Sequence, residues 1–345
     1  MKVMHLLQSS HFSGAENVVC QIISMTRNIE GIEMIYCSTE GTIEDALKER
    51  NISFFPLHTF TIKNIKSAIS KIKPDIIHAH DMNATFKASL VCGNIPLISH
   101  IHNNAFDSRK VNLKSLAFYF STKKVKHIFW VSKSAYESYF FSKQIEDKSS
   151  ILYNILDEEQ LMRRVSLDEN NYDFDVIFLG RITAVKDPYR MLKIFDLLVK
   201  NKKDIKIAVV GTGDMLEEIE LKSKEYGLEK NVIFMGFQSN PSKMLFNSKI
   251  MIMTSLWEGT PMCALEAMSL GVPIVSTPVD GLKDIVENGV NGYLIDDNKL
   301  LSDSILEILI NDDTRKLLSK AQIEKAHKWN DKKKYIDTLI NVYRG

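Results

Sequence analysis

Short apolar segments alternate with amphipathic segments along the whole chain. The apolar segments are rich in β-branched and aromatic side chains, which is typical of strands buried in a parallel sheet. In the first half, the expected strands are residues 2–8, 33–38, 52–57, 75–80, 96–101, 127–132 and 150–153. Helices are expected between them, for example at residues 15–28, 62–73 and 133–142. This alternation predicts an open parallel sheet with helices on both faces.

A polar stretch at residues 157–175, DEEQLMRRVSLDENNYDFD, interrupts the alternation and is expected to be a linker. The pattern then restarts, so the fold class expected is α/β with two domains of similar size. The expected strands of the second half are residues 175–180, 205–211, 231–236, 249–255, 273–277 and 292–295. In two facing domains of this kind, ligands bind in the cleft outside the carboxyl ends of the strands.

Composition and charge leave this picture unchanged. The chain has 345 residues, 45% of them hydrophobic and 25% charged, which suits two ordinary globular domains. A net charge of +1 gives no global reason to bind nucleic acid. There is no secretory signal pattern and no apolar run long enough to span a bilayer, so a cytoplasmic protein is expected. The four cysteines form no C-x-x-C pair, and neither disulfides nor a zinc site are expected.

Two glutamates mark the segment WEGTPMCALEAMSLG, residues 257–271. Glu258 follows an expected strand, and Glu266 lies within an apolar helical run. Thr260 is expected to cap that helix, with Pro261 at its first position. The amides and dipole of the helix start favour an anion such as a diphosphate, and Glu266, about 9 Å further along, is placed to accept ribose hydroxyls. The alternative is a solvent-facing helix with an incidental glutamate, which the apolar neighbours of Glu266 disfavour.

Three more loops follow expected strands. In GRITAVKDP, Arg181 and Lys186 are two cations that can neutralise a diphosphate, unless the loop is merely solvated surface. In SSHFSGAENV, Gly14 permits close approach of a ligand to the backbone. In SHIHNNAF, His100 and His102 share one face of a strand, and one of them is expected to be functional rather than structural. Phe237, Gln238 and the GTGD turn are weaker candidates for a base pocket.

Several other classes fail. GTGDML lacks the third glycine of the dinucleotide fingerprint, which disfavours a dehydrogenase. There is no P-loop, no H-E-x-x-H and no nucleophile elbow. Asp173 and Asp175 form a D-F-D motif at the start of a strand, the wrong end for a parallel-sheet site, and are expected to be a solvated strand edge.

These loops together resemble the retaining glycosyltransferases of family four, with the GT-B fold of two Rossmann-like, doubly wound domains facing across a cleft. The most specific match is E-x7-E within EGTPMCALEAMSLGVPIVST, followed by GRITAVKDP, SGAENV and HNN in the expected order. The resemblance implies an acceptor-binding domain at residues 1–160, a nucleotide-sugar-binding domain at 161–325, and a C-terminal tail helix at 326–345 that packs back on the first domain. The chain has E-G-T-P where many members have E-G-F-G-L-P, which leaves the identity of the donor sugar open.

The resemblance also implies roles for individual residues. Transfer would proceed with retention and without metal or cofactor. The donor would be a nucleotide diphosphate sugar, with UDP as the expected nucleotide. The catalytic residues implied are His102, with His100 as second choice, Arg181, Lys186 and Glu258. The donor-binding residues implied are Gly14, Arg181, Lys186, Phe237, Glu258, Gly259, Thr260, Met262, Cys263 and Glu266.

The acceptor implied is a lipid-linked glycan or a bacterial surface polysaccharide. Residues 109–126 combine cations with apolar side chains, which fits either a surface that contacts anionic membrane or an ordinary solvated helix. The resemblance favours a peripheral enzyme at the inner face of the plasma membrane. Two alternatives on the same fold are a nucleotide-sugar epimerase and a non-catalytic subunit that binds the nucleotide sugar; intact Arg181, Lys186 and Glu266 disfavour the second.

Overall fold

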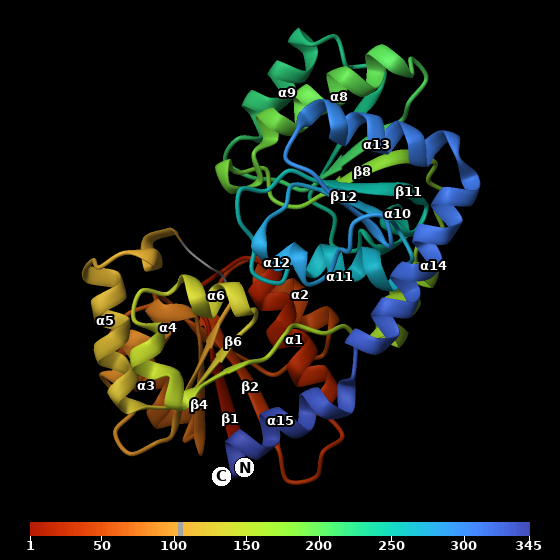
Figure 1. Cartoon of the computed structure of the whole chain (residues 1–345). Helices are drawn as coiled ribbons and strands as arrows, with labels where there is room; N and C mark the ends of the chain where they lie inside the picture. The colour runs from red at the N-terminus through yellow and green to blue at the C-terminus, as the bar shows by residue number, and fades with distance from the viewer. Residues whose placement is uncertain (103–105) are drawn as a thin grey trace. The chain divides into compact units, whose positions relative to one another are not determined.

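The computed structural model of the chain describes residues 1–102 and 106–345. It consists of two compact units (Figure 1). The N-terminal unit contains Met1–Ile155 and Asp331–Gly345, and the C-terminal unit contains Leu156–Asn330. Among the described residues, no helix combines the length and the apolar character that crossing a bilayer requires.

The N-terminal unit is built on a seven-stranded sheet in the order β3-β2-β1-β4-β5-β6-β7, with every pairing parallel. Its strands are β1 Lys2–Leu6, β2 Glu33–Thr39, β3 Phe54–Leu57, β4 Ile76–His80, β5 Leu97–Ile101, β6 Val125–Trp130 and β7 Ser149–Ile151. Its α-helices are α1 Gly14–Thr26, α2 Ile43–Glu49, α3 Ile62–Ile72, α4 Asp81–Ser89, α5 Leu113–Ser121, α6 Lys133–Ser138 and α15 Lys332–Arg344. The expected strands are present, each within about two residues at its ends.

The C-terminal unit has a six-stranded parallel sheet in the order β10-β9-β8-β11-β12-β13. Its strands are β8 Phe174–Leu179, β9 Ile207–Val210, β10 Val232–Gly236, β11 Ser248–Met253, β12 Ile274–Ser276 and β13 Gly292–Leu294. Its α-helices are α7 Glu158–Leu167, α8 Pro188–Asn201, α9 Leu216–Glu225, α10 Ser242–Phe246, α11 Met262–Ser269, α12 Asp280–Lys283, α13 Asn298–Ile310 and α14 Asp312–Trp329. Buried Ile, Val, Leu and Phe side chains fill the space between this sheet and its helices.

Each sheet has one point where the strand order reverses, between β1 and β4 in the N-terminal unit and between β8 and β11 in the C-terminal unit. At such a point the loops at the carboxyl ends of neighbouring strands diverge to opposite faces, which leaves room for a ligand. The polar residues singled out in the sequence follow these strands or their immediate neighbours.

Two expectations about the chain's connections were wrong. The segment expected to be a linker contains helix α7, whose N-cap Asp157 accepts a hydrogen bond from the backbone of Gln160. The tail expected as one helix from residue 326 is divided: α14 ends at Trp329, and α15 begins at Lys332 and belongs to the N-terminal unit. Asp331 caps α15, which explains the division.

Candidate functional site

In the C-terminal unit, the loops after β8 and β11 are bound to each other at the point where the strand order reverses. The Thr254 hydroxyl donates to the carbonyl of Lys186 at 2.7 Å. The backbone amide of Leu256 donates to the carbonyl of Val185 at 2.8 Å. These bonds hold the loop that carries Arg181 and Lys186 beside the loop that carries Glu258.

Lys186 and Glu258 form an ion pair with only 14% and 11% of their side chains exposed. The Ser255 hydroxyl donates to the same carboxylate oxygen at 2.6 Å. Burial by itself lowers the pKa of the Lys186 ammonium, but the adjacent Glu258 carboxylate more than offsets it, and the net pKa is raised. Lys186 is therefore a fixed cation at neutral pH. It is paired with the Glu258 carboxylate, which also accepts a hydrogen bond from a hydroxyl group.

Arg181 is exposed on the same loop and forms no ion pair with any residue that the structure describes. Helix α11 begins nearby at Met262, with Pro261 as its N-cap. The expectation that Thr260 caps this helix was wrong by one residue, because proline at the N-cap leaves no side-chain oxygen to bind the first amides. The first amides of the helix, those of Met262 and Cys263, therefore receive no hydrogen bond from the N-cap side chain.

Glu266 is buried, and its carboxylate oxygen lies 3.3 Å from Nη2 of Arg164 on α7. Asn240 in turn donates to the carbonyl of Arg164 at 2.8 Å. Arg164 was not among the predicted site residues, because its segment was expected to be a linker. A buried carboxylate needs a partner, and that requirement was the one available signal that a cation had to lie nearby.

Close backbone contacts fix the shape of these loops. A Cβ on Gly281 would lie 1.3 Å from the carbonyl oxygen of Gly259, so only glycine fits there. A Cβ on Gly211 would lie 1.9 Å from the carbonyl oxygen of Gly180, and one on Gly213 would lie 2.1 Å from that of Ile182. The GTGD turn thus packs directly against the backbone of the loop after β8.

Two further predicted site residues differ in exposure. Phe237 follows β10 and is 57% exposed, as a side chain that stacks on a base requires. Cys263 is only partly exposed, and burial raises the pKa of its thiol to about 12, so the thiol is neutral and unreactive at pH 7.

In the N-terminal unit, the first predicted loop leads into α1. Gly14 is the first residue of this helix, and a Cβ there would meet nothing within 4 Å. Glu16 is buried and accepts a hydrogen bond from the Ser13 hydroxyl. The open space at Gly14 is consistent with close approach of a ligand.

A cluster of five histidines, four of them buried and one partly buried, lies near the carboxyl ends of β1, β4 and β5. We call it the histidine ladder; its members are His5, His78, His80, His100 and His102. The strand register places His5 beside His78 and His80 beside His100. Burial lowers the pKa of every member, to about 3 for His5 and His102, so the rings are neutral at pH 7.

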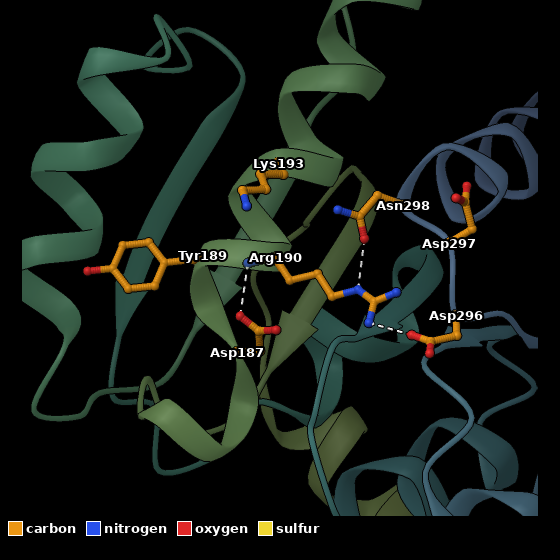
Figure 2. Close-up of a pocket in the computed structure, with 7 residues that line it drawn as sticks. All are labelled: Asp187, Tyr189, Arg190, Lys193, Asp296, Asp297 and Asn298. Carbon is orange, nitrogen blue, oxygen red and sulfur yellow. Dashed lines mark hydrogen bonds and ion pairs between the residues drawn. The ribbon is translucent and has the colours of Figure 1, made fainter.

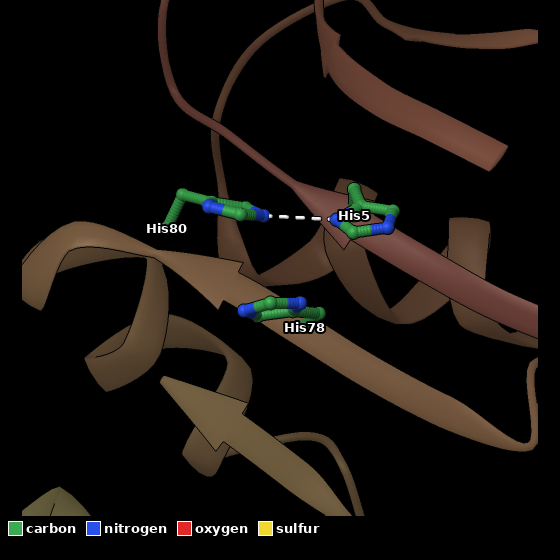
Figure 3. Close-up of side chains that lie close together, drawn as sticks. All are labelled: His5, His78 and His80. Atoms are coloured by element: carbon green, nitrogen blue, oxygen red, sulfur yellow. Dashed lines mark hydrogen bonds between the residues drawn. The ribbon is translucent and has the colours of Figure 1, made fainter. Parts of the chain in front are cut away.

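Hydrogen bonds join three of these rings in a row. Nδ1 of His5 lies 3.0 Å from Nε2 of His80 (Figure 3). Nδ1 of His80 lies 2.8 Å from Nε2 of His102. The backbone amide of His102 donates to Asp81 at 3.0 Å, and burial, only partly offset by this bond, raises the pKa of Asp81 to about 6. Asn103 and Asn104, which complete the HNN motif, lie outside the described residues.

The ring nitrogens are close enough together to suggest a metal, but the spacing of the paired nitrogens does not fit one. Two tetrahedral nitrogen ligands at zinc-bond length lie about 3.3 Å apart. The nitrogens that pair here are closer, 3.0 Å between His5 and His80 and 2.8 Å between His80 and His102. These distances are those of hydrogen bonds. We therefore assign these contacts to hydrogen bonding.

A shallow pocket of about 430 Å³ lies at the start of α8 (Figure 2). Arg190 crosses it and donates to Asn298 at 2.8 Å and to Asp296 at 2.7 Å. Asp187 caps α8 by accepting from the amide of Arg190. These bonds tie α8 to the segment after β13, which is a structural role.

Two family models match adjoining parts of the sequence. The model described as Glycosyltransferase Family 4 matches residues 12–160, and the model described as Glycosyl transferases group 1 matches residues 160–327. The chain belongs to glycosyltransferase family four. The fold and family expected from the sequence are thus confirmed.

Individual relatives of this glycosyltransferase span its whole length. The Escherichia coli UDP-Gal:alpha-D-GlcNAc-diphosphoundecaprenol alpha-1,3-galactosyltransferase is 23% identical over 99% of this chain and 98% of its own. Anabaena HepE, solved in complex with UDP and glucose, has a TM-score of 0.86 at 18% identity, covering 100% of both chains. A variant of S. aureus TarM, solved with fondaparinux, alpha-GlcNAc-glycerol and UDP, has a TM-score of 0.85 at 12% identity, also over 100% of both chains. At these identities the structural likeness shows a common fold, that of GT-B glycosyltransferases.

Proposed function

We propose that this glycosyltransferase moves a hexosyl group from a UDP-sugar to a glycan acceptor, with retention at the anomeric carbon and without a metal or cofactor. The observation that carries the proposal is the buried Lys186–Glu258 pair, held against the start of α11 in the same unit as Arg181 and Glu266. The E. coli relative is named for a UDP-galactose donor, and solved structures of the same fold contain UDP and UDP-glucose.

In this proposal the C-terminal unit binds the donor. Lys186, Arg181 and the first amides of α11 neutralise the diphosphate and stabilise its charge as it leaves. Glu266, oriented by Arg164, accepts the ribose hydroxyls. Glu258 accepts hydroxyls of the transferred sugar, and Phe237 stacks on the base.

The N-terminal unit is proposed to bind the acceptor. Gly14 lets its backbone approach the phosphates, and His102 is the active-site histidine. No side chain is assigned as a covalent nucleophile, so attack and departure take place on the same face of the sugar. The Cys263 thiol is not assigned as a nucleophile, because its raised pKa keeps it protonated at neutral pH.

The acceptor is proposed to be a lipid-linked glycan or surface polysaccharide at the cytoplasmic face of an anionic membrane. The E. coli relative is named for a diphosphoundecaprenol-linked acceptor. In this chain, helix α5 exposes Leu113 by 88% and Phe120 by 57% beside lysines such as Lys123. An apolar edge flanked by cations is suited to an anionic lipid surface.

The donor proposal is tested by calorimetry of the whole chain with UDP, GDP, ADP and their common sugars, in buffer with EDTA. We expect UDP and one UDP-sugar to bind, and Glu266→Ala to weaken UDP binding severely. A chain that binds none of these nucleotides, or binds only with added metal, would refute the proposal. The stereochemistry is tested by proton NMR of the anomeric position of the product.

Membrane contact is tested by sedimentation with vesicles of phosphatidylcholine and phosphatidylglycerol. We expect Leu113→Asp with Phe120→Asp to abolish binding. Leu167→Asp is the matched control, because Leu167 is 70% exposed at the end of α7. Equal binding of the wild type to vesicles with and without phosphatidylglycerol would remove the anionic-lipid part of the proposal.

A further inference from the structure

We infer that His80 and His5 are positioning residues that fix the tautomer of His102. They do so through a chain of hydrogen bonds in which each ring donates to the next, from His102 through His80 and His5 to the sulfur of Met34. The inference rests on the proposed function, because it gives His102 a defined role towards the substrate: its Nδ1 accepts a hydrogen bond from a substrate hydroxyl. Its physical basis is the chemistry of the atom at the far end of the chain.

Met34 sets the direction of the chain. Nε2 of His5 lies 3.4 Å from the Met34 sulfur, within hydrogen-bond range for this atom. A thioether sulfur has no hydrogen and can only accept. The hydrogen in this contact must therefore be on Nε2 of His5. Met34 is buried on β2. Its sulfur also lies 3.0 Å from the Thr26 hydroxyl, which is 2.7 Å from the carbonyl of Ile22 as well, and a thioether with two lone pairs can accept from both neighbours.

The tautomers of the other two rings follow one after another. A neutral imidazole carries one hydrogen, so Nδ1 of His5 has a bare lone pair and accepts from Nε2–H of His80 at 3.0 Å. Nδ1 of His80 is then bare and accepts from Nε2–H of His102 at 2.8 Å. This leaves the lone pair on Nδ1 of His102. The reverse direction would set the lone pair of His5 Nε2 against the lone pairs of the sulfur.

The free end of the chain is a buried acceptor without a partner. Nδ1 of His102 has no hydrogen-bond partner among the residues that the structure describes. It is closed to solvent in this structure, so a substrate hydroxyl reaches it only after the atoms that cover it move. The backbone of His102 is also fixed, since its amide donates to Asp81, a residue held in the left-handed region at φ 69°. An unpaired buried acceptor costs free energy unless a ligand satisfies it.

The chemistry that would satisfy this atom is a donor group. A sugar hydroxyl can donate to Nδ1 of His102, whereas a phosphate or carbonyl oxygen cannot. The chain therefore selects a hydroxyl at this position and rejects the matching deoxy compound, because the lone pair would stay unpaired. His78 lies outside the chain, since its Nδ1 is bonded to the Tyr343 hydroxyl at 2.7 Å.

The tautomer is measured by NMR of the whole enzyme labelled with 15N in its histidine rings, using two-bond correlations to the ring carbon protons. The His102 signals are assigned by their loss in His102→Gln. We expect His102 in the wild type to be the Nε2–H form alone. In Met34→Leu, which conserves volume and should cost little stability, we expect the Nδ1–H form to appear.

Met4→Leu is the matched control, because Met4 is also buried, on the neighbouring strand, but contacts the core on the opposite face. We expect it to leave the tautomer unchanged. A wild-type His102 in the Nδ1–H form would overturn the inference, as would a tautomer in Met34→Leu identical to that in the wild type. This measurement needs no substrate, so it stands or fails independently of the proposed function.

Kinetics then separate a positioning role from a merely structural one. In Met34→Leu we expect kcat to fall about tenfold, the worth of one neutral hydrogen bond, with the KM for UDP-sugar unchanged and Met4→Leu at the wild-type rate. A shifted tautomer with unchanged kcat would overturn the positioning role. A wild-type enzyme that binds no UDP-sugar would instead refute the proposed function and leave the tautomer result intact.

Discussion

The two regions where strand order reverses handle buried polar groups in opposite ways. In the C-terminal unit, Lys186 and Glu258 keep full charges and neutralise each other at the edge of the site. In the N-terminal unit, the rings of the histidine ladder are uncharged, because burial lowers the pKa of each ring. Hydrogen bonds between neutral rings join His5, His80 and His102. The two sheets share their parallel architecture, so the difference comes from the side chains.

Because of this difference in charge, the two regions are suited to different parts of a ligand. A fixed ammonium beside a helix start attracts an anion and can stabilise a charged leaving group. A neutral ladder has little attraction for an anion, but it holds one lone pair in a defined place. Charge thus suits the diphosphate end of the proposed reaction, and neutrality suits the hydroxyl end.

Acid should affect the two regions most differently, because between pH 7 and 5 the unfolded N-terminal unit binds protons at histidines that stay neutral in the folded ladder. Its histidines have lowered pKa values when folded, so their stabilising effect is complete above pH 6.5 and is lost as the pH falls towards about 3. Each such proton is worth about 1.4 kcal/mol per pH unit. Asp81 opposes this, since its raised pKa favours the folded state most below pH 3.8 and loses that effect as the pH rises through about 6.

We therefore expect the free energy of unfolding of the N-terminal unit to fall by several kcal/mol between pH 7 and 5. Trp130 lies in that unit and reports on it when Trp257 and Trp329 are replaced by phenylalanine. The measurement is a urea titration of Trp130 fluorescence at both pH values. Equal midpoints would mean that the ladder is not neutral in the folded state.

Removing the charge from the C-terminal region should have the next largest effect. In Lys186→Ala we expect turnover to fall by about 10²–10³, the loss of one preorganised electrostatic contact. We also expect a lower Tm, because Glu258 is left buried without its partner. Adding Glu258→Gln should restore the Tm but not the turnover. Lys193→Ala, an exposed lysine on α8, is the control; normal turnover in Lys186→Ala would remove Lys186 from the site.

The backbone contact beneath Glu258 is expected to be nearly as important for stability. Gly281→Ala forces a Cβ into the carbonyl oxygen of Gly259, and we expect a loss of about 3 kcal/mol. A urea titration of the C-terminal unit measures it. An unchanged midpoint would show that the Gly259 loop can move aside without cost.

The pair between Arg164 and Glu266 offers a smaller, more specific change. In Arg164→Gln we expect UDP affinity to fall about tenfold, because Glu266 loses the group that orients it. Calorimetry of UDP binding measures this effect. Arg163→Gln, at the exposed neighbouring position of α7, should bind like the wild type. If both variants bind UDP equally well, Glu266 does not need Arg164.

The smallest effect is expected at Gly14. In Gly14→Ala the new Cβ meets empty space and improves the helix, so stability should rise by up to about 1 kcal/mol. If the phosphates approach this backbone, the KM for the donor should nevertheless rise a few-fold. A KM equal to that of the wild type would place the phosphates elsewhere.

The site residues differ in how far sequence could define them. The spacing of Glu258 and Glu266 and the cations at Arg181 and Lys186 were visible because each follows a strand that the apolar pattern predicts. The partner of Glu266 was not, since α7 has few apolar residues and its helical nature depends on packing against α10. Asp175, expected at a solvated edge, is buried and paired with Lys249 at 2.8 Å, a contact between neighbouring strands.

The alternation of strands and helices, the two-domain α/β class and the loops that carry charge could all be predicted from the sequence, because hydrophobic periodicity and turn chemistry are local properties. Which distant groups meet depends on the folded chain. The chain from His102 to Met34 joins β5, β4, β1 and β2, and no local pattern encodes the register that brings them together. The tautomer of His102 depends on a sulfur atom 68 residues away in sequence, because a hydrogen bond responds to distance in space and to the one proton that each ring can hold.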